Sequence, residues 1–244
     1  MITDNPAARL LEILKKGKKI VGNVTSRSAW QKILEMESDD ESELYSKLGK
    51  VMSLTKETID ILKKYSLGES DSWIHWSTQI HNSFSSYSLN DAWPRFINGI
   101  DQHSMSYLHL HSQLIESKIL EGTDLNIEKL LEIRKDLQDL IADIISCELS
   151  PRIKEFLLRS FKKIVDAIDE HHITGQIAII DAIDAAFGHF ATDENYRAEI
   201  SSSSIYSKLT DTLSVLANAA TIFTGVDTKQ ISSAVSFLIA KTSS

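Results

Sequence analysis

Acidic and histidine side chains that could hold a metal ion gather in the second half of the chain. Asp166, Asp169 and His172 follow one another at helical spacing, and Asp181 and Asp184 lie one turn apart further on. Carboxylate and imidazole groups together can bind a divalent metal. If the predicted helices 150–172 and 176–190 packed side by side, these five residues would form the site of a metal-dependent hydrolase-type enzyme.

The same residues also have an ordinary structural explanation, which we favour. The chain contains neither an HExxH motif nor the paired ExxH motif of di-iron bundles. His172 lies at a predicted helix end, where histidine can bond the last carbonyls. Asp166 and Asp169 lie at helical spacing from lysines that could pair with them. The metal site therefore stays the alternative, and no cofactor is the first expectation.

The apolar stretch 175–190 contains the two aspartates that decide between these interpretations. On a helical wheel the large apolar side chains occupy one arc, and Asp181 and Asp184 form a narrow stripe outside it. An unpaired carboxylate within a core is costly and tends to bind a proton. We therefore expect this acidic stripe to face outward, unless it faces the preceding helix.

A second candidate group combines aromatic and histidine residues between positions 73 and 111. Buried tryptophan needs a partner for its indole N–H, so such residues line ligand pockets as well as cores. Core packing is the favoured explanation, and a ligand pocket or peptide groove is the alternative. The candidate ligand-binding or partner-binding residues are Trp73, Trp76, Trp93, His103 and His111.

Recognised catalytic motifs are absent from the sequence. There is no GxSxG nucleophile turn, no GxGxxG and no GxxxxGK[ST] phosphate loop. The single cysteine, Cys147, lies on a predicted core position, which favours an inert buried thiol. These absences favour a protein that binds rather than one that catalyses.

Composition narrows the class of protein. Only 3 prolines and 9 glycines interrupt 244 residues, which favours long helices. A net charge of −8 without a broad basic face argues against nucleic-acid binding. One cysteine and no secretory signal predict a cytoplasmic protein. The uncharged hairpin expected at 213–240 is too short in each arm to span a bilayer, so membrane action is only a second alternative.

Two predicted helices show how the chain is patterned. The first begins at Pro6 behind the capping residue Asn5 and is expected to end at Gly17. The second, at 126–148, carries two adjacent apolar stripes, from which we expect contacts with more than one neighbouring helix. One stripe is a heptad seam of Leu130, Ile133, Leu137, Leu140, Ile144 and Cys147, and the other comprises Ile127, Leu131, Ile141 and Ile145.

The sequence therefore predicts an all-α protein, a multi-helix and largely antiparallel helical bundle. A small N-terminal helical region, 1–68, would pack on a main bundle, 69–244, or the two would form one continuous domain. The predicted function is that of a non-enzymatic interaction or assembly protein. It would bind a protein partner or form a homo-oligomer through apolar helix faces, without nucleic acid.

Overall fold

The fold is all-α, as the sequence predicts. The computed structural model describes residues 4–119, 127–192 and 194–224. These residues form eleven helices and no β-strand, apart from one isolated bridge between Thr25 and Ala92. Long amphipathic segments and sparse glycine and proline account for this outcome.

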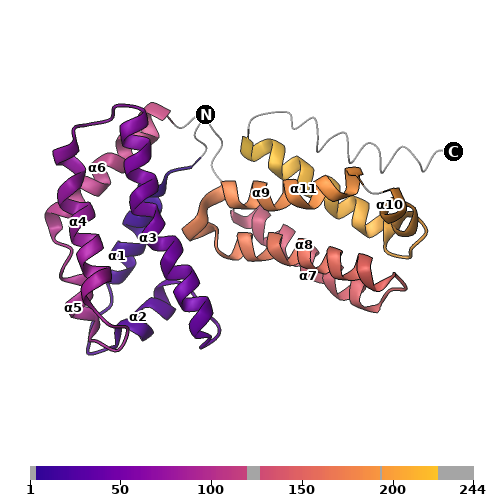
Figure 1. The fold of residues 1–244 in the computed structure, drawn as a ribbon, viewed down its shortest axis with the longest axis horizontal. Helices are drawn as coiled ribbons and strands as arrows, with labels where there is room; N and C mark the ends of the chain where they lie inside the picture. The colour runs from indigo at the N-terminus through magenta and orange to yellow at the C-terminus, as the bar shows by residue number, and fades with distance from the viewer. Residues whose placement is uncertain (1–3, 120–126, 193, 225–244) are drawn as a thin grey trace. The chain divides into compact units, whose positions relative to one another are not determined.

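The chain divides into two compact units, Met1–Leu120 and Glu121–Ser244 (Figure 1). The boundary predicted after residue 68 would separate two helices, Glu41–Lys64 and Ser70–Ser86, which pack against each other within the first unit. The first unit contains α1 (Pro6–Lys18), α2 (Ser26–Ile33), α3 (Glu41–Lys64), α4 (Ser70–Ser86), α5 (Trp93–Ile97) and α6 (Gln102–Ile119).

Helix α1 is the inner helix of the first unit. Asn5 caps it as predicted: its side-chain oxygen accepts a hydrogen bond from the Ala8 backbone N–H at 3.1 Å. Apolar side chains are buried around more than one side of the helix, and α2, α3, α5 and α6 all pack against it. The Asn5 amide also donates to the Ser112 carbonyl at 2.9 Å, which joins the start of α1 to α6.

Gly17 does not end α1, contrary to the prediction. The helix continues to Lys18, and Gly17 is buried within it. The indole N–H of Trp93 donates to the Gly17 carbonyl at 2.9 Å. A β-carbon at position 17 would lie 2.8 Å from Cζ2 of Trp93 and 3.1 Å from Cδ1 of Ile97. Glycine is required here for the close approach of α5, not for a helix cap.

The second unit contains α7 (Ile127–Ser146), α8 (Pro151–Asp169), α9 (His171–Thr192), α10 (Glu194–Ser201) and α11 (Tyr206–Thr224). Helices α7 and α9 each pack against both α8 and α11, so four helices enclose one apolar core. All six residues of the heptad seam on α7 are buried in it, which confirms that prediction.

Two contacts at opposite ends fix the direction of α7 and α8. Arg134, near the start of α7, pairs with Asp169 at the end of α8. Lys154, near the start of α8, donates to the Ile145 carbonyl near the end of α7 at 3.0 Å. These two helices therefore run in opposite directions. A largely antiparallel arrangement of the whole bundle stays a prediction.

Gly175 separates the two parts of α9. Its φ of 73° lies in the region that glycine adopts at little cost, and the helical geometry is broken at this residue. The long apolar part of the helix follows, as the sequence pattern predicts. A side chain at position 175 would strain the turn that joins α8 to that part.

Gly17→Ala is expected to destabilise the first unit by about 1–3 kcal/mol, because the new methyl group overpacks the contact with Trp93. Urea unfolding followed by tryptophan fluorescence measures this, since all 4 tryptophans lie in the first unit. The matched control is Gly49→Ala on α3, where no atom lies within 4 Å of the added β-carbon. The free energy of unfolding of this control should rise by about 0.5–1 kcal/mol, because alanine favours a helix more than glycine does. Equal stability of the two variants would contradict the packing role of Gly17.

Candidate functional site

Asp169 and His171, at the end of α8 and the start of α9, have structural partners. Asp169 forms an ion pair with Arg134, with Nη2 and Oδ2 3.1 Å apart. Nδ1 of His171 donates to the Ile168 carbonyl at 2.8 Å, which is the helix-end role expected of histidine here. Asp166 is exposed, and His172 is half-buried. The Asp169 carboxylate is thus already neutralised by a guanidinium.

The two aspartates of α9 are both exposed, as expected from the wheel. Partial burial, together with the charge of Asp181, raises the pKa of Asp184 above its usual value. Within the described ranges, no group of three or more histidine, cysteine or acidic side chains is arranged to hold a metal ion. The structure does not bring the five predicted metal ligands together into a site.

Four of the five aromatic and histidine candidates lie in the core of the first unit. Trp73 is 7% exposed, and Trp76, Trp93 and His111 are at most 1% exposed. Trp93 stacks on Phe96 with ring centroids 5.1 Å apart and meets Trp30 edge to face. Their burial shows that these four residues pack in the core, which is the explanation that the sequence favours.

A hydrogen-bonded chain fixes His111 in one neutral form. Trp76 Nε1, which can only donate, lies 3.1 Å from His111 Nδ1, so Nδ1 must accept and carry no proton. His111 Nε2 then carries the proton and donates to Ser72 Oγ at 3.1 Å. Ser72 in turn donates to the Glu69 carbonyl at 2.6 Å. Burial lowers the pKa of His111, in agreement with this neutral form.

Gln79, which the sequence analysis did not single out, joins α4 to the start of α6. Its amide nitrogen donates to the Asp101 carboxylate at 2.8 Å, and its oxygen accepts from the Asp101 backbone N–H at 2.8 Å. Asp101 also accepts from the Ser104 N–H at 2.7 Å, and this hydrogen bond is the largest cause of its strongly lowered pKa. This carboxylate is saturated by hydrogen bonds and is not a free base.

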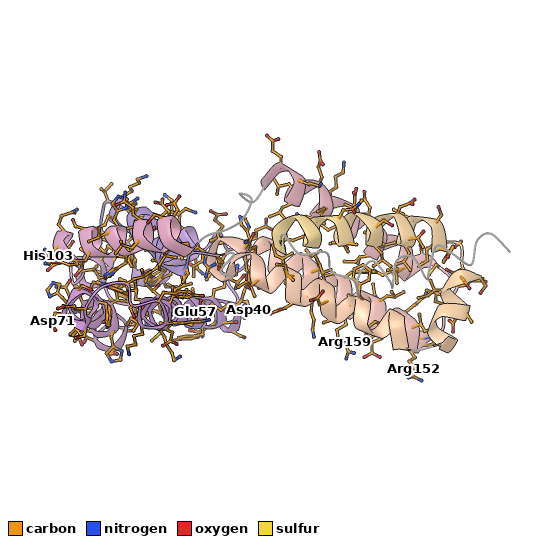
Figure 2. All side chains as sticks on the ribbon, turned by 90° about the horizontal axis from the view of Figure 1, so that it is seen from above. Asp40, Glu57, Asp71, His103, Arg152 and Arg159 are labelled. Atoms are coloured by element: carbon orange, nitrogen blue, oxygen red, sulfur yellow. The ribbon has the colours of Figure 1, made fainter. Side chains whose placement is uncertain are left out.

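His103 is the exposed member of the aromatic and histidine group (Figure 2). Its ring meets that of His75 with centroids 5.4 Å apart and that of Tyr107 with centroids 4.7 Å apart. His75 is itself engaged, with Nε2 3.1 Å from the Asp101 carboxylate. These side chains form a polar surface beside the Gln79 contact and no enclosed site.

The structure adds a groove that the sequence analysis did not anticipate. It lies between α3 and α4 and has a volume of about 520 Å³. Apolar, hydroxyl-bearing and charged side chains from successive turns of both helices line it. The lining residues are Met52, Thr55, Lys56, Ile59, Asp60 and Lys63 of α3, and Ser77, Thr78, Ile80, His81 and Phe84 of α4.

The groove has an apolar floor and a charged rim. Ile80 is buried at its base, while Met52 is 42% exposed. Lys56 and Asp60 neutralise each other at 2.5 Å. Lys63 is exposed and forms no ion pair within the part of the chain that the structure describes. The rim therefore carries one uncompensated positive charge.

Comparisons with family models, with curated proteins and with solved structures found no match to this chain. Among the described residues, no helix is both long enough and apolar enough to cross a membrane. The part of the predicted 213–240 hairpin beyond residue 224 lies outside the described residues.

The stability of the first unit is expected to fall as the pH is lowered from 7 to 5. The folded state holds His111 neutral with a lowered pKa, whereas the unfolded chain binds a proton near pH 6.5. The stabilisation is complete above that pH and is lost as the pH falls towards the folded-state pKa. Urea unfolding followed by tryptophan fluorescence at several pH values measures the slope.

His111→Gln should flatten this slope, because the titrating group is gone. The matched control is the exposed His103→Gln, for which the slope is expected to stay as in the wild type. A slope that is the same in wild type and His111→Gln would contradict the neutral hydrogen-bonded role of His111.

Proposed function

We propose that this protein is a non-enzymatic interaction protein that binds an amphipathic helix of a protein partner in the groove between α3 and α4. The observation that carries the proposal is the groove itself, with its apolar floor and exposed Met52. A groove between two helices with an apolar floor and a polar rim is the kind of surface that binds an amphipathic helix.

The shape of the groove suits a helix. From Met52 to Lys63 the α3 wall spans eleven residue steps, a length of about 16 Å at about 1.5 Å per step. That length matches about three turns of a bound helix. Such a helix inserts apolar side chains at i, i+3 or i+4, and i+7 into a groove between two helices.

The charges of the groove indicate the chemistry of the partner. Since Lys56 is neutralised by Asp60, the charge left to a partner is that of Lys63. An acidic side chain on the flank of the bound helix would pair with it. Rim charges of this kind set the partner's orientation and association rate more than its affinity.

The lining residues favour binding over catalysis. The lining contains no cysteine, and His81 is the single histidine in it. His81 is exposed and lies 3.5 Å from Ser85 Oγ, too far to activate it strongly as a nucleophile. Lys56 and Asp60 are engaged with each other.

Met52→Glu is expected to weaken partner binding by about tenfold or more, because a charge replaces an apolar anchor. Affinity capture from the native host with quantitative mass spectrometry identifies the protein that wild type retains and the variant loses. A peptide from that protein then measures the affinity by titration calorimetry. Hydrogen exchange should show protection on α3 and α4 when the peptide binds.

The matched control is Tyr45→Glu, an equally drastic change at an exposed residue of α3 that does not line the groove. It should bind the partner as wild type does. Lys63→Glu should slow association, whereas Lys64→Glu, outside the lining, should not. Equal binding by all four variants, or protection elsewhere than on α3 and α4, would refute the groove as the binding site.

A further inference from the structure

Helix α7 of the second unit has an apolar row that the bundle core does not use. Leu131 is 59% exposed and Ile145 is 62% exposed, although both belong to the second stripe that was expected to meet another helix. The heptad seam on the other side of α7 supplies the core contacts. Ile141 of this stripe packs against the core, so Leu131 and Ile145 are the members available for contact outside the unit.

Gln138 is the midpoint of this row. Leu131 precedes it by seven residues and Ile145 follows it by seven, so the three side chains lie within about 20° of one direction. Ala142, between Gln138 and Ile145, is exposed and small enough to permit close approach of another helix. The row is therefore symmetric about Gln138, with one large apolar side chain at each end and an amide in the middle.

Two opposite charges flank the row on one side. Lys135 and Asp139 lie about 60° and about 100° from Gln138 in the same rotational sense. Both are exposed, and neither forms an ion pair within residues 127–192 or 194–224. They are thus free to pair with a matching surface.

We propose that a second copy of this chain binds this face, with the two α7 helices antiparallel about a two-fold axis through Gln138. The symmetry places Leu131 of each copy against Ile145 of the other and brings the two Gln138 amides together. Lys135 of each copy then lies at nearly the height of Asp139 of the other, offset by about 3 Å along the axis. Two ion pairs and two apolar contacts form from one self-complementary surface.

Charge complementarity favours the second copy over an unrelated partner. An antiparallel two-fold contact places Lys135 of each copy on the same edge as Asp139 of the other, whereas a parallel contact about the same row would put these residues on opposite edges, where they could not pair. A polar residue at the centre of an apolar row commonly fixes the register of such helix pairs. The contact is short, at the low end of interface sizes of less than about 1,200 Å², so the dimer is weak.

A cysteine at the axis tests the geometry in the full chain. In a Cys147→Ala background, Gln138→Cys should give a disulfide-linked dimer under mild oxidation, because the two sulfur atoms would meet at the axis. The control is Asp136→Cys, exposed on the same helix but turned about 160° from Gln138. Cross-linking of both variants to the same extent, or of the control alone, would overturn the proposal.

A charge exchange tests the pairing by sedimentation velocity at about 10–200 µM chain. Wild type should show a concentration-dependent dimer. Lys135→Asp and Asp139→Lys should each raise the dissociation constant by about threefold to tenfold, since like charges then face each other. The double variant should restore the wild-type value, and Leu131→Glu should abolish the dimer while leaving helicity by circular dichroism unchanged.

A wild-type chain that stays monomeric over the whole range, or a double variant weaker than both single ones, would overturn the proposal. The result does not depend on the α3–α4 groove. Met52→Glu serves as a further control, because it should leave the dimer unchanged and so separates this inference from the proposed partner binding.

Discussion

The first unit depends on satisfying the indole N–H groups of tryptophans that are removed from water. A buried N–H without an acceptor costs about as much as a lost hydrogen bond, and the indoles of Trp76 and Trp93 each have an acceptor. Trp93 finds the carbonyl of Gly17, which brings α5 against α1. Trp76 finds His111, which joins α4 to α6. These two bonds join two pairs of helices, α1 with α5 and α4 with α6.

The same requirement decides which residues remain for binding. Because Trp73, Trp76, Trp93 and His111 are committed to the core, the residues that look most like a ligand site in the sequence are largely withdrawn from solvent. The open surface lies instead between α3 and α4, where the side chains are individually unremarkable. Residue type alone therefore selects side chains that hold the core together. The groove depends instead on how α3 and α4 pack against each other.

Helix α7 of the second unit carries two apolar stripes that the sequence does not distinguish, but their burial in the structure differs. One stripe of α7 is buried against its neighbours, and the other leaves Leu131 and Ile145 in solvent. The acidic and histidine residues are separated in a similar way. Helical spacing allows Asp169 to join a metal site, but in the structure its carboxylate forms an ion pair with Arg134 of α7. The buried stripe of α7 and the carboxylate of Asp169 are both contacted by residues that are distant in the sequence.

The sequence by itself determined the all-α class, the cap of α1 at Asn5 and the core seam of α7, because these follow from local hydrogen bonding and a period of 3.6 residues. Tertiary structure alone decided that Gly17 makes room for Trp93 rather than ending a helix. It also decided that α3 and α4 leave a groove, and that Leu131 and Ile145 of α7 stay exposed. These outcomes depend on which helices become neighbours, and the period of a single helix carries no information about its neighbours.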